Sequence, residues 1–194
     1  MRVLIAEDEP VVAEALKERL EALEHIVAGM AYDGRDAVAQ ADAVAPDLIF
    51  LDVKMPHLDG IQAVAAIMAR RPVPIIVLTA HADPAVIERA LAEGVMGYLV
   101  KPVKQKDLEP AIAVAVSRFA DLLALRRDVR SLKDAIALRQ QVQRARGVLM
   151  GRLGVSEAAA HRHLQRFAER EQITVAKAAT QVITADEFFA SLEE

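Results

Sequence analysis

Five short apolar runs recur along the first hundred residues, and amphipathic segments separate them. The runs show little polar alternation and span Arg2–Ala6, His25–Met30, Leu48–Leu51, Pro74–Leu78 and Gly97–Val100. Such runs are typical of strands that are covered on both faces of a parallel sheet. Alternation of five strands with helices predicts one doubly wound, five-stranded parallel α/β domain over residues 1–120.

Proline and capping residues mark where the intervening helices begin and end. Pro10 suits the first turn of a helix, and Asp83-Pro84 reads as an N-cap followed by proline at the first helical position. Helices are also expected over Gly34–Ala45 and from Ile61 to Arg71, and the one after Asp83 ends near Gly94. Each expected strand is thus followed by a helix that can cover the sheet.

Polar residues stand where four of these strands end. Glu7 and Asp8 follow the first strand, Asp52 ends the third, Thr79 the fourth and Lys101 the fifth. The carboxyl ends of parallel strands meet at one edge of a doubly wound sheet, where such folds place their chemistry. A single acid at a strand end is usually only solvated, but this set predicts a shared site at that edge.

A different pattern follows Pro102. Between Lys106 and Arg139 there is no glycine, and Pro110 is expected in the first helical turn, where proline is tolerated. Apolar residues keep a spacing of three and four, first at Ile112, Val116, Phe119 and Leu123 and then, after a step, at Leu122, Leu125, Val129, Leu132 and Ile136. This spacing predicts a long helix with a coiled-coil seam, and residues 121–138 are the expected linker. The seam can pack on the helix's own domain, on a second protomer or on the C-terminal helices.

Residues 139–194 are expected to form a small all-α domain of three helices. Val142, Ala145 and Leu149 line the first helix, and Ser156 and Thr174 are expected to cap the other two. Residues 139–183 carry eight Lys and Arg against three Asp and Glu, although the whole chain has a net charge of −4. This basic zone favours an anionic partner, although a solvated basic face is the ordinary alternative.

Composition limits the classes of protein that remain. The chain has 194 residues, 54% of them hydrophobic, so a sizeable core is expected and general disorder is not. Cysteine is absent, which excludes a disulfide framework and a cysteine-ligated metal site. No apolar run reaches membrane-spanning length and no signal-peptide pattern opens the chain, so a cytoplasmic location without membrane association is expected.

The first 120 residues resemble the CheY-like receiver domain of bacterial two-component response regulators, which has a flavodoxin-like fold. The motifs that carry this resemblance are Glu7-Asp8, Asp52 with Met55-Pro56 and Asp59-Gly60, Thr79-Ala80, Tyr98 and Lys101-Pro102. The resemblance implies that a sensor histidine kinase is the partner and that Asp52 is the phosphoacceptor. It implies no enzyme beyond self-catalysed phosphoryl transfer and dephosphorylation.

The resemblance also implies a Mg²⁺ cofactor. Asp8, Asp52 and the backbone carbonyl of Lys54 are the implied direct ligands, with Glu7 acting through water. Lys101 is expected to pair with the phosphoryl group, and its bond to Pro102 is expected to be cis.

Two further residues are expected to form a switch. By the same resemblance, Thr79 donates its hydroxyl to the phosphoryl oxygen and Tyr98 then turns inward behind it. The simpler alternatives are that Thr79 only caps the following loop and that Tyr98 is a fixed, half-buried aromatic residue.

The C-terminal residues are similar to a second family, the ANTAR domain of transcription antitermination regulators. The matching residues are Gln141–Met150, Gly154–Ala158, Leu164, Ala168 and Ala179, and Arg146 stands where the family usually has lysine. The similarity implies binding to structured RNA with paired stem-loops in nascent transcripts. The candidate contacts are Arg144, Arg146, Arg162, Arg166 and Arg170, of which the last three recur every fourth residue.

Three functions therefore remain open. The first is a phosphorylation-controlled antiterminator that binds RNA as a homodimer when phosphorylated. The second is a DNA-binding regulator with a helix after Ser156 or Thr174 in the major groove, although no compact helix-turn-helix stands out. The third is a module that only dimerises or binds a protein. An independent phosphatase is disfavoured, because no second acid follows Asp52 at a spacing suited to acid–base catalysis.

Overall fold

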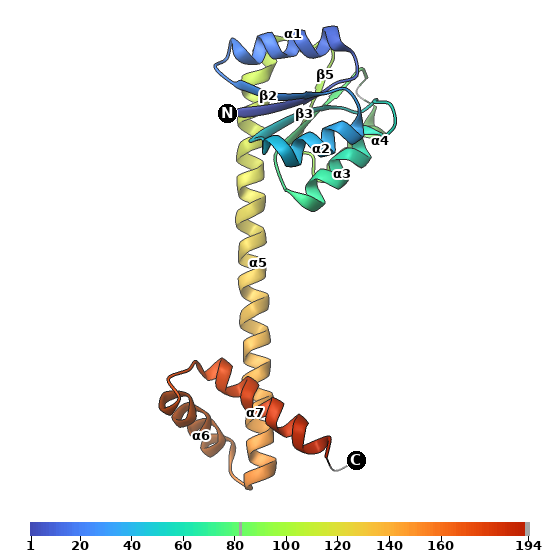
Figure 1. Ribbon diagram of the computed structural model, residues 1–194. Helices are drawn as coiled ribbons and strands as arrows, with labels where there is room; N and C mark the ends of the chain where they lie inside the picture. Colours follow the sequence, from blue (N-terminus) through green and yellow to red (C-terminus); the bar gives the residue numbers. More distant parts are fainter. Residues whose placement is uncertain (82, 193–194) are drawn as a thin grey trace. The chain divides into compact units, whose positions relative to one another are not determined.

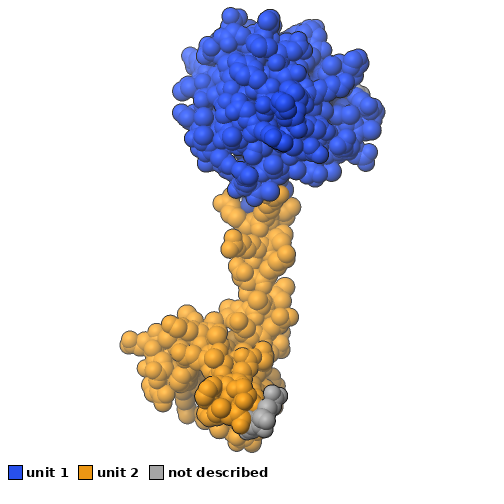
Figure 2. Space-filling view, turned by 45° about the vertical axis from the view of Figure 1, so that its right-hand side comes forward, with its two compact units in different colours: residues 1–124 blue, residues 125–194 orange. Residues whose placement is uncertain are grey.

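The computed structural model describes residues 1–81 and 83–192 (Figure 1). The chain divides into two compact units, residues 1–124 and 125–194, which Figure 2 colours separately. The first unit contains the strands β1 (Arg2–Ala6), β2 (Ile26–Ala31), β3 (Leu48–Asp52), β4 (Ile75–Thr79) and β5 (Gly97–Val100). They form one parallel sheet in the order β2-β1-β3-β4-β5, which confirms the predicted five-stranded α/β fold.

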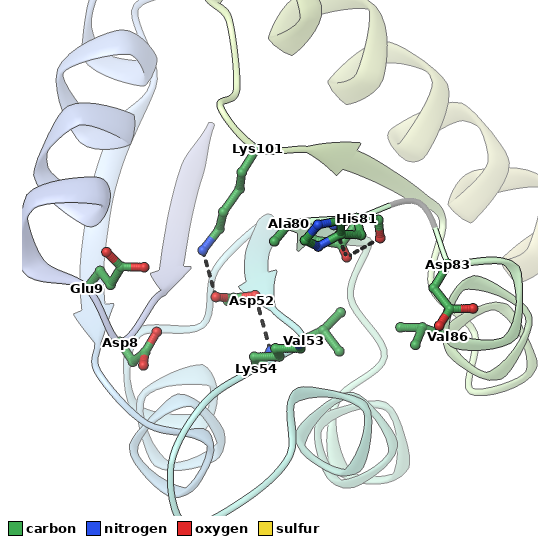
Figure 3. Close-up of a pocket in the computed structure, with 11 residues that line it drawn as sticks. Asp8, Glu9, Asp52, Val53, Lys54, Ala80, His81, Asp83, Val86 and Lys101 are labelled. Atoms are coloured by element: carbon green, nitrogen blue, oxygen red, sulfur yellow. Dashed lines mark hydrogen bonds and ion pairs between the residues drawn. The ribbon is translucent and has the colours of Figure 1, made fainter.

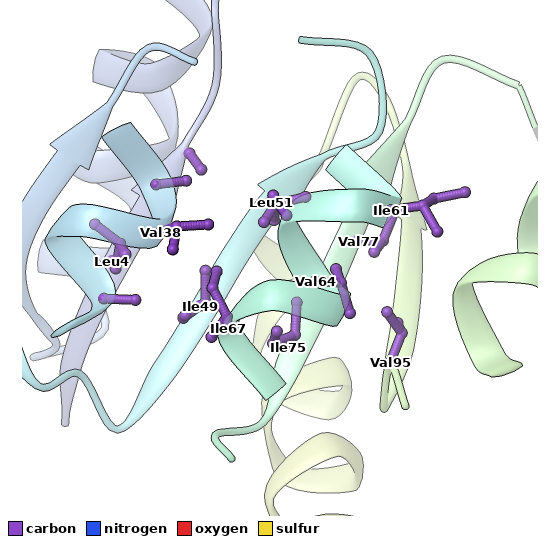
Figure 4. Close-up of a cluster of buried hydrophobic side chains, with 14 of the residues drawn as sticks. Leu4, Val38, Ile49, Leu51, Ile61, Val64, Ile67, Ile75, Val77 and Val95 are labelled. Carbon is purple, nitrogen blue, oxygen red and sulfur yellow. The ribbon is translucent and has the colours of Figure 1, made fainter. Parts of the chain in front are cut away.

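Helices cover both faces of this sheet, and the strands alternate their side chains between two cores. The helices of the first unit are α1 (Pro10–Glu21), α2 (Gly34–Val44), α3 (Gly60–Arg70), α4 (Pro84–Ala92) and the start of α5 (Gln105–Leu153). Val3 and Ile5 of β1 pack with buried residues of α1 and α5. Leu4 and Ala6 pack with those of α2, α3 and α4 on the opposite face (Figure 4). Burial on both faces explains the continuous apolar runs of the inner strands β1, β3 and β4. The edge strands β2 and β5 are only partly buried, so the expectation of cover on both faces is wrong for these two.

Short polar side chains begin the helices as the sequence predicted. Asp83, Ser156 and Thr174 each accept a hydrogen bond from a backbone N–H in the first turn of the helix that follows. Asp33 and Asp59 cap α2 and α3 in the same way, although these two caps were not predicted from the sequence. Each cap satisfies backbone donors that have no partner inside the helix.

Helix α5 runs without interruption for 49 residues, across the expected boundary between linker and C-terminal domain at residue 139. Its sequence there contains strong helix formers and no proline, so Gly147 and Gly151 are accommodated inside the helix. The helix ends before Gly154, which has a φ of +62°. Pro110 lies inside the helix rather than in the expected first turn, so the carbonyl of Lys106 receives no helical hydrogen bond from residue 110.

The predicted seam on α5 divides into two parts. Ile112 and Phe119 are only 6% and 8% exposed because they pack against the sheet of their own unit. Of the three partners that the sequence left open for the seam, this first part therefore packs on the helix's own domain and not on a second protomer. Further along, Leu125, Leu132 and Ile136 are 61%, 64% and 59% exposed. No C-terminal helix covers them, so that alternative is also excluded for the described residues.

The second unit is a small helical bundle. The C-terminal part of α5 packs with α6 (Glu157–Arg170) and α7 (Val175–Ala190). The buried cluster at its core is small and consists mostly of small residues, namely Ala145, Leu164, Ala168, Ala178, Ala179 and Ile183. So small a core provides limited stability. None of the helices in residues 1–81 and 83–192 is both long enough and apolar enough to cross a membrane.

Candidate functional site

The residues that end the strands meet at one edge of the sheet, as predicted. Asp52 is the last residue of β3, and Glu7 and Asp8 directly follow β1, the neighbouring strand. The chain reverses its direction of winding between these two strands, which opens a crevice outside their carboxyl ends. A cavity of about 390 Å³ lies there, lined by Asp8, Glu9, Asp52, Val53, Lys54, Thr79, Ala80, His81, Asp83, Val86 and Lys101 (Figure 3).

Lys101 connects the buried carboxylates. Its Nζ donates to Asp52 Oδ2 at 2.6 Å and to Glu7 Oε1 at 2.8 Å, and it lies 2.6 Å from Glu7 Oε2. The other oxygen of Asp52, Oδ1, accepts a hydrogen bond of 3.2 Å from the Lys54 backbone N–H (Figure 3). Glu7 is fully buried and Asp52 is 5% exposed. The peptide bond from Lys101 to Pro102 is cis, as expected. Lys101 therefore fixes one oxygen of a nearly buried carboxylate.

Burial and charge change the acidity of this cluster. Burial raises the pKa of Glu7, and the Asp52 charge raises it further, while the hydrogen bond from Lys101 opposes both. Burial alone would lower the pKa of Lys101, but the hydrogen bonds to Asp52 and Glu7 outweigh it and raise the pKa above its ordinary value. The ammonium of Lys101 therefore stays charged and partly compensates for two carboxylates held close together.

The three acids fit a divalent cation. Glu7, Asp8 and Asp52 each offer a carboxylate oxygen, and these oxygens all lie within 4.8 Å of one another. Hard oxygen donors of this kind suit Mg²⁺ better than softer metals. Asp8 is exposed whereas its two neighbours are buried, so the cluster opens toward the cavity on the Asp8 side. The chemistry of the donor set therefore agrees with the expected cofactor.

The two expected switch residues are not in the arrangement that the resemblance implies for the phosphorylated state. Thr79 Oγ1 donates to the backbone carbonyl of His81 at 2.7 Å, so in this state it caps the loop after β4. Tyr98 is 45% exposed. Both line an apolar cavity of only about 10 Å³ beside Val86 and Ala90 of α4. A phenol ring cannot enter so small a space unless α4 residues move.

Gly60 holds the end of β3 in place. Its N–H donates to the Val53 carbonyl at 2.9 Å, closing the loop that follows Asp52. A Cβ atom at this position would lie 2.1 Å from the Asp52 carbonyl oxygen and 2.8 Å from the Val53 Cα. Only glycine therefore allows α3 to begin this close to the backbone of Asp52.

Several residues of the cavity wall were not assigned to the site from the sequence, among them Glu9, Asp83 and Val86. Glu9 extends the acidic run of Glu7-Asp8, which was the available signal for it. Asp83 was recognised only as a helix cap, and it both caps α4 and lines the cavity. Val86 carries no chemical signal, because its place at the wall follows only from the packing of α4. The added carboxylates make the cavity mouth more acidic than the predicted set alone.

The candidate RNA contacts differ in their surroundings. Arg144 pairs with Glu187 of α7 at 2.7 Å, and Arg146 pairs with Glu157 at the start of α6. Arg170 pairs with Glu171 at 2.9 Å, and its guanidinium lies 5.5 Å from the centre of the Phe167 ring.

The other two candidates, Arg162 and Arg166, are exposed on α6. Neither has an ion pair with a carboxylate in the part of the chain that the structure describes. They are therefore the candidates whose charge is most accessible to a phosphate backbone.

Comparisons with known proteins match a different family in each of the two units. The family model of the response regulator receiver domain matches residues 3–113, and that of the ANTAR domain matches residues 130–183. The transcriptional regulatory protein PdtaR of Mycobacterium tuberculosis is 42% identical over 182 residues, which cover 94% of this chain and 89% of PdtaR. The positive alginate biosynthesis regulatory protein of Pseudomonas aeruginosa is 35% identical over 117 residues, 59% of this chain and 47% of that protein.

Solved structures show the same fold in the first unit. The signal receiver domain of a modulated diguanylate cyclase from Desulfovibrio desulfuricans G20 aligns with a TM-score of 0.57 and 33% identity, over 61% of this chain and 95% of that one. The receiver domain of the response regulator NarL from Mycobacterium tuberculosis aligns with a TM-score of 0.57 and 30% identity, over 60% and 95% of the two chains.

Proposed function

The chain belongs to the response regulators that join a receiver domain to an ANTAR domain, and we propose that it is a phosphorylation-controlled RNA-binding antiterminator. We assign the receiver role to residues 1–120, the linker role to 121–138 and the RNA-binding role to 139–194. The observation that carries the receiver assignment is Lys101, whose Nζ lies 2.6 Å from the carboxylate of Asp52 at the floor of an acidic cavity.

Asp52 is the proposed phosphoacceptor. Its carboxylate oxygen attacks phosphorus, the bond from phosphorus to the donor breaks, and an acyl phosphate forms. The donor is a phosphohistidine of a sensor kinase or a small acyl phosphate. Lys101 orients the acceptor and, after transfer, pairs with a phosphoryl oxygen. Burial of Asp52 limits water around the product.

Mg²⁺ is the proposed cofactor of this step. Asp8, Asp52 and the Lys54 carbonyl would hold it, and Glu7 would act through water. When bound, the ion neutralises negative charge on the carboxylates and on the phosphoryl group. The need for a cation follows from the cavity itself, because carboxylates outnumber the ammonium groups that line it.

Thr79 and Tyr98 are proposed to transmit phosphorylation. The Thr79 hydroxyl leaves the His81 carbonyl and donates to the phosphoryl oxygen instead. Tyr98, which is exposed in this structure, then moves inward as α4 shifts. A change at one residue thereby alters the surface around α4 and β5, a local event with a wider effect.

The output is proposed to be binding of paired stem-loops in a nascent transcript in the cytoplasm, by a homodimer that phosphorylation favours. One small bundle presents few accessible arginines, so two bundles that hold two loops together gain effective affinity. Phosphorylation would raise the population of the dimer-competent form. Arginine contacts to phosphates make the binding steeply dependent on salt.

Labelling with a small phosphodonor tests the receiver assignment. Acetyl phosphate should add one phosphoryl group, detected by intact-protein mass spectrometry, only when Mg²⁺ is present. Asp52→Ala should not label, whereas Thr79→Ala should label without any downstream change in oligomeric state or RNA affinity. Labelling of Asp52→Ala, or labelling that survives a chelator, would disprove the assignment.

Parallel measurements of binding and sedimentation test the output. A two-loop RNA, duplex DNA and an unstructured RNA are titrated with and without phosphodonor, at several salt concentrations. Phosphorylation should strengthen dimerisation and binding of the two-loop RNA together. The double variant Arg146→Ala/Arg166→Ala should bind RNA more weakly than the parent. The slope of log affinity against log salt should also fall by about one unit for each arginine removed. The control Arg130→Ala should change neither quantity.

Other outcomes of the same panel would replace this proposal. Preference for duplex DNA would make the chain a DNA-binding regulator. Phosphorylation-dependent dimerisation without binding to any nucleic acid would make it an interaction module. Tight, salt-insensitive RNA binding by a monomer would refute the two-loop mechanism.

A further inference from the structure

Arg146 differs from the other candidate RNA contacts because its side chain is mostly packed inside the second unit. Only 22% of this side chain is exposed, compared with 63% for Arg144 and 73% for Arg170. The neighbouring Ala145 is fully buried, and Nε of Arg146 is buried without a hydrogen-bond acceptor among the described residues. The guanidinium of Arg146 is therefore confined to one region, whereas long exposed side chains move among many rotamers.

Glu157 holds this guanidinium from the neighbouring helix. Nη2 of Arg146 donates to Oε1 of Glu157, which is the first residue of α6. The backbone of Glu157 is fixed, because the Ser156 hydroxyl accepts from the N–H of Ala159 at 3.4 Å and caps the helix. A carboxylate in the first turn is also stabilised by the positive end of the helix dipole. The ion pair thus joins α5 to a fixed point at the start of α6.

A carboxylate beside an RNA-binding arginine can have either of two opposite effects. It can compete with RNA for the guanidinium, so that its removal strengthens RNA binding. It can instead order the guanidinium before RNA arrives, so that its removal weakens binding, because a free side chain must be immobilised on association. The two effects predict opposite signs for the same substitution.

The burial of Arg146 favours ordering over competition. Arg144 and Glu187 form an exposed pair, with side chains that are 63% and 57% accessible, and ion pairs of this kind are weak. In contrast, Arg146 already has one buried nitrogen without an acceptor, and loss of Glu157 would remove the acceptor of a second nitrogen. Unsatisfied donors are costly in a packed site, so the guanidinium would leave its present position.

We therefore propose that Glu157 is a positioning residue for RNA binding, which holds the Arg146 guanidinium ready to donate to an RNA phosphate. The proposal deepens the proposed function and rests on it, because it assigns the residue that prepares one of the proposed contacts. A guanidinium has five N–H donors in a rigid fork, so one side can bind the carboxylate while another faces a phosphate. Glu157 acts through Arg146 and does not itself touch the RNA.

Affinity for a synthetic RNA with two adjacent stem-loops tests the sign of the effect. The full-length protein is first phosphorylated with acetyl phosphate and Mg²⁺. Glu157→Ala should raise the dissociation constant about three- to tenfold, the equivalent of ordering one long side chain, although it removes a negative charge from the protein. The control Glu187→Ala removes the same charge from the exposed pair and should bind as tightly as the parent or more tightly.

Further measurements show whether Glu157 acts through Arg146. In the Arg146→Ala background, Glu157→Ala should change the RNA dissociation constant less than about twofold. The slope of log affinity against log salt should fall by about one for Arg146→Ala but stay at the parental value for Glu157→Ala, which keeps the phosphate contact. Without RNA, Glu157→Ala should speed the hydrogen exchange of the Arg146 Nε–H, followed by heteronuclear NMR, at least about tenfold.

Unchanged or stronger RNA binding by Glu157→Ala would overturn the proposal, because the carboxylate would then be neutral or would compete with RNA. Equal weakening by Glu157→Ala in the parent and in the Arg146→Ala background would also overturn it, because the effect would then arise from the fold of the bundle. Failure of the proposed function has a different signature. The phosphorylated parent would then bind none of the tested RNAs, whereas hydrogen exchange at Arg146 would still depend on Glu157.

Discussion

Gly60→Ala should lower the free energy of unfolding of the first unit, because the added methyl group would clash with the backbone of Asp52. The added Cβ would lie 2.1 Å from the Asp52 carbonyl oxygen, which is 0.9 Å closer than the 3.0 Å that real Cβ contacts respect. The atoms in contact are backbone, so either α3 or the end of β3 must move. Forced movement of this kind costs about 2–3 kcal/mol, even though alanine favours the helix more than glycine by about 1 kcal/mol.

The natural fluorescence of the chain allows this unit to be followed alone. The chain has two tyrosines and no tryptophan, and Tyr32 and Tyr98 both lie in the first unit. Urea unfolding monitored by tyrosine fluorescence should show the loss of about 2–3 kcal/mol for Gly60→Ala. The control Gly97→Ala, where a Cβ would meet nothing within 4 Å, should stay within about 0.5 kcal/mol of the parent.

Displacement of Asp52 should also slow phosphorylation. A shift of about 1 Å in a reacting group can cost up to about 100-fold in rate, so acetyl phosphate should label Gly60→Ala at least about tenfold more slowly than the parent. Parental stability together with parental labelling would refute the reasoning, because it would mean that Gly60 does not constrain the end of β3.

Two further predictions concern the buried acid and the small second core. Burial raises the pKa of Glu7, so its stabilising contribution is greatest below its ordinary pKa and is lost as pH rises through the raised value. Melting curves recorded without metal should therefore show the melting temperature of Glu7→Gln increasing relative to that of the parent as pH rises from about 4. The same substitution at the exposed Glu9 should not produce this increase. Leu164→Ala, at a fully buried site, should destabilise the second unit by about 3 kcal/mol and so lower the temperature at which its helices melt, without moving the tyrosine transition of the first unit. The control Leu192→Ala, whose side chain is 67% exposed, should change neither transition.

The fold of the first unit could be predicted from the sequence. Strands buried on both faces need continuous apolar runs, and each run ended within one residue of the carboxyl end of its strand. Glu7, Asp52 and Lys101 were therefore predicted to meet although they are far apart in the chain, because parallel topology brings all strand ends to one edge. The helix caps at Asp83, Ser156 and Thr174 were equally local, since each depends on a few consecutive residues.

The burial of α5, in contrast, could not be predicted from its sequence. Residues 112–136 repeat one apolar spacing, but Ile112 is buried by the sheet of its own unit whereas Leu132 is exposed. The spacing gives the face of a helix and contains no information about what covers that face. The same limit applies at the site, where Val86 reaches the cavity only because of how α4 packs. The sequence placed Lys101 at the same sheet edge as Asp52 and Glu7, but only the structure shows the ion pairs that it makes with them. A sequence pattern fixes the conformation of each segment, whereas burial and charge pairing depend on contacts between distant segments.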